Sequence, residues 1–227
     1  MLEAELSFLP SSPSDGLEAV MTVAEKLVKA VAQSYDASPE AVYFYSLHPH
    51  LQAQVQSAAS PTTPYPRLTY AAAIDILAAH AAAHPTAFVF PPQHGQSIQT
   101  EHEKWLADEH VQGPLFVTDY PADQKPWYML RSANGMTAAC FDLLVPRLGE
   151  LIGGSLREHR EKELRDSMMK HGVVEKQYEW YLDLRKYGST RHGGFGMGWE
   201  RLVAFLTGIE NVRDCIAFPR ATEGSRF

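Results

Sequence analysis

The sequence has little cysteine and no long apolar run. Its 227 residues include two cysteines, Cys140 and Cys215, which are too few for a disulfide framework or a cysteine-ligated zinc site. We expect both to be buried free thiols in a reducing compartment. No stretch approaches the roughly 20 apolar residues of a membrane span, and the N-terminus has neither a signal peptide nor an arginine-rich transit pattern. These absences favour a soluble intracellular protein, mitochondrial or cytoplasmic, with no membrane partner.

Positive charge is also scarce. The formal net charge is −7, which argues against a protein that coats nucleic acid non-specifically, because such binding depends on many phosphate contacts. An enzyme that meets RNA through a local basic patch stays possible. With 45% hydrophobic and 21% charged residues, the composition is that of an ordinary globular protein of about one domain.

The most informative stretch lies near the C-terminus, at residues 193–202, and reads GGFGMGWERL. Glycines 194, 196 and 198 alternate, so in a strand they share one face that has no Cβ atoms and can accept a flat ligand. Residues 200–206 predict a helix that ends at Gly208. Arg201 then lies in the first turn, where a cation is poorly placed for the helix dipole, and this indicates a bound polyphosphate. The alternative is a bulged strand packed under a helix.

A second stretch, residues 149–158, reads GELIGGSLRE. A carboxylate in this apolar strand would cost several kcal/mol without a cation, so Glu150 predicts a nearby Mg²⁺ that bridges ATP phosphates. Gly153 lets the backbone approach a ligand, and Arg157 can clamp a carboxylate through two hydrogen bonds. The alternative is a salt bridge between Glu150 and Arg157, with the glycines in a bulge.

The remaining pattern predicts an α+β fold. Apolar spacing indicates a helix to about residue 34 and another over residues 69–84, joined by a polar linker at 50–67. Strands are expected at 114–121, 125–129 and 137–145, and their short links favour antiparallel pairing. We place the aromatic residues Trp180 and Tyr181 in the core.

Taken in order, three segments resemble the class II aminoacyl-tRNA synthetases, within their Asp/Asn/Lys subgroup and with the asparaginyl enzymes in particular. They are residues 113–129, 141–160 and 179–220. The resemblance implies an antiparallel sheet flanked by helices, with residues 193–202 as motif 3. It also implies site residues: Glu150, Gly196, Gly198, Glu200 and Arg201 for ATP, Glu150 for Mg²⁺, Arg157, Gly153 and Glu101 for the amino acid, and Arg201, Glu150 and Arg157 for catalysis.

Three N-terminal and central carboxylates have two interpretations each. Glu101 begins a helix within Glu101-His102-Glu103, where a carboxylate complements the helix dipole. The asparaginyl enzymes carry a similar tripeptide at the amino-acid pocket, so Glu101 is also a candidate pocket residue. Glu3 and Glu5 lie either on a solvated strand face or at the ATP and Mg²⁺ site.

Residues 1–8 alternate as a strand and resemble the second half of motif 2. We therefore expect residues 1–227 to be a catalytic domain that runs from within motif 2 through motif 3, truncated at its N-terminus, without motif 1 or the anticodon-binding domain. The family's homodimer uses motif 1, so we do not expect that dimer for this piece alone.

The resemblance implies ATP-dependent activation of asparagine to the adenylate and transfer to tRNA(Asn). Asparagine is favoured over aspartate by the GELIGGS wording, and a glutamate facing the side chain would repel aspartate by roughly 4 kcal/mol at 4 Å. Alternatives are a paralog that resembles an aspartyl-tRNA synthetase or an asparagine synthetase, and a non-catalytic binding module.

Overall fold

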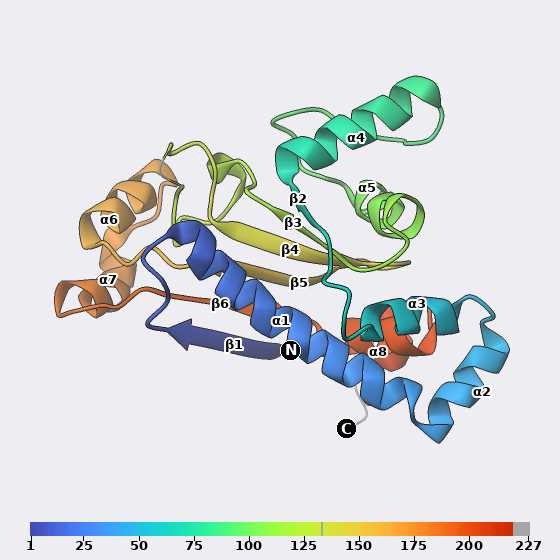
Figure 1. Cartoon of the computed structure of the whole chain (residues 1–227). Coiled ribbons are helices and arrows are strands. Elements are labelled where there is room, and N and C mark those ends of the chain that lie inside the picture. The colour runs from blue at the N-terminus through green and yellow to red at the C-terminus, as the bar shows by residue number, and fades with distance from the viewer. Residues whose placement is uncertain (133, 220–227) are drawn as a thin grey trace.

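A single six-stranded sheet organises the chain (Figure 1). In this computed structural model, which describes residues 1–132 and 134–219, the strand order is β1-β6-β5-β4-β3-β2. The strands are β1 (Leu2–Ser7), β2 (Arg67–Thr69), β3 (Leu115–Thr118), β4 (Cys140–Val145), β5 (Gly149–Leu156) and β6 (His192–Met197). Neighbours are antiparallel except β2 and β3, which are parallel. The expected helix-flanked sheet is confirmed, with this one parallel pair.

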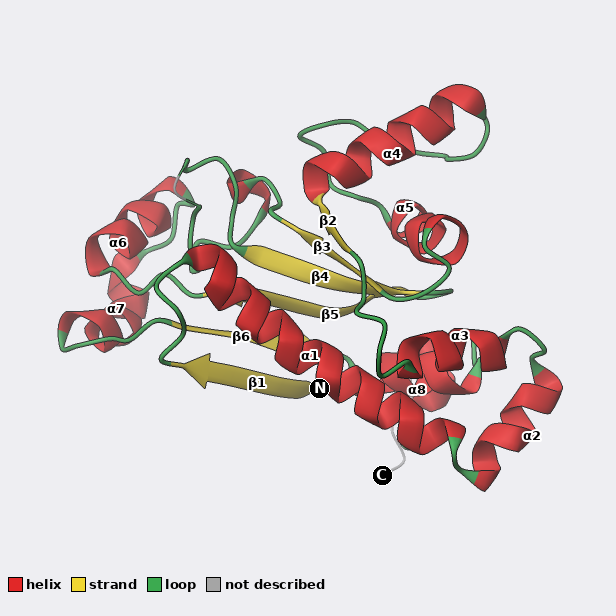
Figure 2. Cartoon of the chain, viewed as in Figure 1, coloured by secondary structure: helices red, strands yellow, loops and turns green. Residues whose placement is uncertain are grey.

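One face of the sheet is covered by three helices, α1 (Pro13–Asp36), α3 (Leu51–Ala59) and α8 (Trp199–Thr207). Helix α1 begins because Ser12 caps it and Pro13 occupies its first turn. Its apolar stripe packs on inward side chains of the strands, including Phe195 and Met197 of β6. Figure 2 shows α1 crossing the sheet in front of β5 and β6. This face holds the larger core.

The opposite face is covered over part of its width. Helix α4 (Tyr70–Ala83), the short helix α5 (Thr100–Trp105) and the π-helical turn that continues it (Leu106–His110) pack on β3 and β4. Beyond β4 the face of β5, β6 and β1 carries glycines and carboxylates in place of apolar side chains. This half of the face is where a ligand can approach the backbone.

Helices α6 (Glu161–Lys170) and α7 (Glu179–Lys186) lie beyond one end of the sheet, away from α2 (Pro39–Leu47), α3 and α8 (Figure 1). They share a small core of Leu164, Met168 and Leu182, against which Trp127 and Tyr181 pack. Shorter helical turns occupy Ala122–Gln124, Glu175–Tyr178 and Val212–Cys215.

Several expectations about local structure are wrong. The supposed linker at 50–67 contains α3, because Leu51, Val55 and Ala58 form a helical apolar stripe ahead of the prolines. Residues 125–129 are not a strand, and Met129 makes a single bridge to Arg157. Trp180 is 63% exposed rather than part of the core.

Both cysteines are free, as expected, but Cys140 is buried and Cys215 is half-buried. No helix in the described part of the chain is both long and apolar enough to cross a membrane. Arg220, the last residue of the family resemblance, lies outside the described residues.

Candidate active site

The open half of the sheet face is built from rows of residues that the strand register places side by side. One row runs Glu3, Gly196, Gly153 and Asp142 across β1, β6, β5 and β4. The next row runs Glu5, Gly194, Ser155 and Cys140. The glycine face expected for residues 194, 196 and 198 therefore forms in part, with an acidic edge on β1 and a carboxylate from β4. Gly194 and Gly196 lie in β6, whereas Gly198 follows the strand as the N-cap of α8. A ligand here meets open backbone at Gly196, where an added Cβ would contact only the Met1 side chain, and charge on both sides. The space over Gly194 is occupied by Glu5 and the Ala4 carbonyl.

Arg157 stands at the end of β5 beside this floor. Its Nε lies 3.1 Å from Glu5 Oε1, and Nη1 donates to Ser155 Oγ at 2.6 Å. Its guanidinium carbon lies 5.5 Å from the centre of the Tyr128 ring. Arg157, Glu5 and Gly196 line one shallow cavity of about 310 Å³. Its carboxylate partner in the described structure is Glu5, so the alternative salt bridge to Glu150 is wrong.

Carboxylates converge at the other end of the floor. The site of a Cβ on Gly153 would lie 2.8 Å from Glu150 Oε1 and 3.6 Å from Asp142 Oδ1, so the two acids flank the same point. A register shift between Leu143 and Leu144 puts Glu150 on the face of Gly153 despite their odd spacing. Asp142 also accepts from Lys125 Nζ at 2.9 Å. Among the described residues no set of three metal-ligating side chains is arranged to hold an ion by itself.

Glu103 completes this acidic group from α5. Its Oε2 accepts the backbone N–H of Glu150 at 3.3 Å. Burial raises the pKa of Glu103 to about 7, with help from the negative charges of Glu150 and Asp142 and against the effect of Arg201. Protein atoms packed around the Glu150 carboxyl reduce its hydration, and together with the negative charge of Asp142 they raise its pKa. The residue as a whole is nevertheless exposed. Negative charge within this group thus disfavours ionisation of Glu103 and Glu150, and a bound cation would stabilise their charged forms.

Arg201 supplies positive charge to the same region. Gly198 caps α8, so Arg201 lies in the first helical turn as expected. Its Nη2 donates to Leu148 O at 3.0 Å, whereas its buried Nε has no hydrogen-bond partner among the described residues. A buried donor without a partner is costly, and a phosphate oxygen would satisfy it. The glycine floor, this unsatisfied donor and the paired acids Asp142 and Glu150 together fit ATP with Mg²⁺.

The predicted site residues do not all lie together. Glu150, Gly153, Gly196 and Arg157 lie on the open face, and Gly198, Glu200 and Arg201 adjoin it in the first turn of α8. Glu101 is the exception: its carboxylate accepts the backbone N–H groups of Val89 and Phe90 at 3.0 and 2.7 Å. Its place in the amino-acid pocket stays a prediction. Sequence reasoning missed Glu103 and Asp142, although a carboxylate inside the apolar strand 140–145 was a visible signal.

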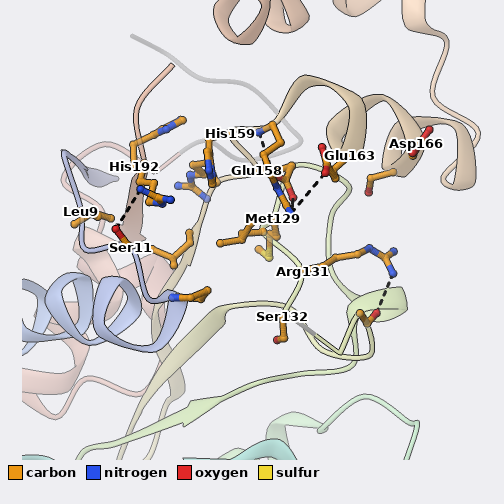
Figure 3. Close-up of a pocket in the computed structure, with 18 of the residues that line it drawn as sticks. Leu9, Ser11, Met129, Arg131, Ser132, Glu158, His159, Glu163, Asp166 and His192 are labelled. Atoms are coloured by element: carbon orange, nitrogen blue, oxygen red, sulfur yellow. Dashed lines mark hydrogen bonds and ion pairs between the residues drawn. The ribbon is translucent and has the colours of Figure 1, made fainter. Parts of the chain in front are cut away.

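A second, larger cavity of about 480 Å³ lies behind Arg157, between the start of α1 and α6. Figure 3 shows Glu158 and His159 beside it, with His192 and Ser11 on one side and Glu163 on the other. Arg157 lines both cavities, so this residue lies between them.

Comparison with known proteins identifies the family of the chain. Residues 1–222 match the family described as tRNA synthetases class II (D, K and N), and the chain belongs to that family. Curated relatives include an asparagine–tRNA ligase of Desulfitobacterium hafniense, 40% identical over 234 residues, and one of Bacillus cytotoxicus, 40% identical over 228 residues. In both cases all of this chain and 47% of the relative are covered. The chain therefore spans about half the length of the curated relatives it matches.

Among solved structures, asparaginyl-tRNA synthetases are similar to this chain in both fold and sequence. The asparaginyl-tRNA synthetase of Entamoeba histolytica in complex with asparaginyl-adenylate matches 97% of this chain and 47% of its own, with a TM-score of 0.82 and 32% identity. That of Pyrococcus horikoshii with asparaginyl-adenylate gives the same TM-score and identity and is covered over 46% of its length. An aspartyl-tRNA synthetase of Entamoeba histolytica, at 22% identity and a TM-score of 0.72, shares the fold.

Proposed function

We propose that this chain forms part of an asparagine–tRNA ligase, which activates asparagine with ATP and transfers it to tRNA(Asn). The observation that carries the proposal is the floor of Gly194, Gly196 and Gly153, with Arg157 at one end and Arg201 near the acidic group at the other. Whole-chain identity of 40% to asparagine–tRNA ligases supports the choice of amino acid.

The chemistry assigned here is attack of the asparagine carboxylate on the α-phosphorus of ATP, which releases pyrophosphate and leaves the adenylate. Such a step depends on position and charge neutralisation more than on acid and base groups. The glycine floor, with Gly198 and Glu200 beside it, would seat the nucleotide, and Arg201 would hold a terminal phosphate. Asp142 and Glu150 would bind Mg²⁺, which supplies further neutralisation of phosphate charge when bound.

Arg157 is assigned to the amino acid. Its present partner Glu5 is exposed, and the two side chains form a bidentate ion pair. Arg157 Nη2 lies 3.2 Å from Glu5 Oε2. A substrate group could replace that carboxylate on the same guanidinium. We further propose that Glu101 and Gly153 make secondary contacts with the amino acid. We also propose that residues 1–227 form one catalytic unit, that the full-length protein is a homodimer, and that it is located in mitochondria or the cytoplasm.

The test is exchange of labelled pyrophosphate into ATP by this chain with asparagine, and with aspartate as the control. We expect exchange with asparagine alone. Arg201→Ala should abolish ATP binding without unfolding the protein, and Arg157→Ala should weaken asparagine far more than ATP. Unchanged ATP affinity in the first variant, or equal losses in the second, would refute the roles given to these arginines.

A further inference from the structure

Arg185 is a buried cation in a peripheral helix. It lies in α7 and is 7% exposed, whereas arginine is rarely buried unless it is paired. Nevertheless, no carboxylate forms an ion pair with it within residues 1–132 and 134–219. Its Nη2 donates to the Tyr181 hydroxyl at 2.9 Å, and its guanidinium carbon lies 4.1 Å from the centre of that ring. The structure must therefore gain something from this arginine other than charge pairing.

What Arg185 holds is the backbone next to Arg157. Its Nε donates to the carbonyl of Glu158 at 3.0 Å, across 27 residues of sequence. The neighbouring backbone is fixed on two further sides: Arg157 N donates to His192 O at 3.0 Å, and Glu158 N donates to Tyr128 O at 2.8 Å. Arg185 is thus the side-chain member of a three-point attachment that sets where the Arg157 backbone leaves β5.

Helix α7 also supports the other wall around Arg157. The Trp127 ring meets Tyr178 and Tyr181 edge to face, with centroids 5.2 and 5.3 Å apart. Trp127 directly precedes Tyr128, whose ring lies under the Arg157 guanidinium. Two separate connections therefore run from α7 to Arg157, one through the Glu158 carbonyl and one through the edge-to-face contact of the Tyr181 and Trp127 rings. In contrast, α7 contributes nothing to the described surroundings of Arg201, whose carbonyl partner is Leu148.

We propose that Arg185 is a positioning residue that fixes Arg157 and so sets affinity for the amino acid without acting on the nucleotide. The effect on substrate rests on the proposed role of Arg157, whereas the effect on Arg157 itself does not. An error of about 1 Å in a binding group can cost on the order of 100-fold. Loss of Arg185 should weaken asparagine binding by about 10- to 100-fold and change ATP binding by less than about twofold.

The experiment compares Arg185→Met, Arg185→Lys and a control, Arg165→Met, in the full chain. Arg165 lies on α6 and forms surface ion pairs with Glu161 and Glu175. The Arg165→Met substitution therefore removes a nearby positive charge without changing a contact of residues 157–158. Calorimetry measures asparagine and Mg²⁺–ATP binding, and NMR measures the Nε–H signal of Arg157, assigned with Arg157→Ala. Circular dichroism reports whether α7 remains folded.

We expect Arg185→Met to shift or broaden the Arg157 Nε–H signal and to weaken asparagine selectively. Arg185→Lys, which keeps one donor group, should lie between Met and wild type, and Arg165→Met should match wild type. An unchanged Arg157 signal in a folded Arg185→Met variant would overturn the inference, as would equal losses of asparagine and ATP. If wild type bound no asparagine, the proposed function would fail, but the Arg157 signal would still decide the role of Arg185.

Discussion

Replacing Glu103 by glutamine should stabilise the protein at neutral and alkaline pH. The folded structure raises the pKa of Glu103 from 4.5 to about 7 because it buries the carboxyl next to Glu150 and Asp142. A rise of this size corresponds to about 3 kcal/mol of preference for the neutral form. Glutamine is neutral at every pH and keeps an oxygen that can accept the Glu150 N–H.

The sign follows from proton binding. Between pH 4.5 and about 7 the folded protein keeps a proton on Glu103 that the unfolded chain has lost. The free energy of unfolding of wild type therefore falls there by at most about 1.4 kcal/mol per pH unit relative to Glu103→Gln. The difference should be absent below pH 4.5 and complete above about 7, where the variant is more stable by up to about 3 kcal/mol. Partial contact with solvent will reduce this value.

Urea denaturation of wild type and Glu103→Gln from pH 4 to pH 8.5 measures the effect, because other titrating groups cancel in the difference. The control is Glu101→Gln, two residues away. Backbone N–H groups of Val89 and Phe90 lower the pKa of Glu101, so this variant should lose stability as the pH rises. A Glu103→Gln variant that is less stable than wild type at pH 8 would refute the assigned environment of this carboxyl.

Three further substitutions, one of them a control, test a buried ion-pair cluster of α1 and the glycines of β6. Glu25→Gln should cost about 3 kcal/mol of unfolding free energy at pH 7, because the buried carboxylate binds Lys29 and Arg67 at 2.8 and 2.7 Å. Burial opposes ionisation of Glu25, but these partners outweigh it and lower its pKa. Urea denaturation should therefore show that the stability lost in Glu25→Gln becomes smaller as the pH falls below 4.5. A loss of stability that does not depend on pH would contradict this. Gly196→Ala should leave the melting temperature nearly unchanged and weaken ATP binding in calorimetry, because the added Cβ meets only the Met1 side chain at 3.7 Å. Gly194→Ala is its matched control: the Cβ would overlap the Ala4 carbonyl, so a folding loss of about 1–3 kcal/mol is expected, and equal melting temperatures for the two variants would be contrary evidence.

The two glycines that β6 contributes to the floor could be predicted from sequence, because their alternation follows strand periodicity. Alternation at 194 and 196, the helix after Gly198 and the position of Arg201 in its first turn need no knowledge of the rest of the chain. The helix α3 could also have been found, since Leu51, Val55 and Ala58 have helical spacing. The prolines at 61, 64 and 66 follow the end of this helix, so they do not exclude it.

The acidic group could not be predicted in this way. Period-2 alternation places Glu150 and Gly153 on opposite faces, and only the irregular register beside Leu144 brings them together. The choice between Glu101 and Glu103 depends on how α5 is rotated against β5, which local spacing does not determine. The burial of Arg185 depends on α7 docking near the end of β5, a contact between distant segments.

The covered face of the strands contributes to stability, and the open face of the same strands forms the candidate ligand site. Phe195 and Met197 of β6 are 2% and 0% exposed against the helices on the covered face, and they alternate with the glycines of the ligand floor. Stability can therefore come from one side of β6 while the other side stays free of side chains, since successive residues point to opposite faces. Substitutions at Phe195 or Met197 should lower stability and binding together, because they move the whole strand. Binding can fail alone only through the floor, the groups that surround it and the residues that position those groups, such as Arg185. A selective loss of ligand affinity in a stable variant is therefore the strongest evidence that a residue belongs to the site or supports it.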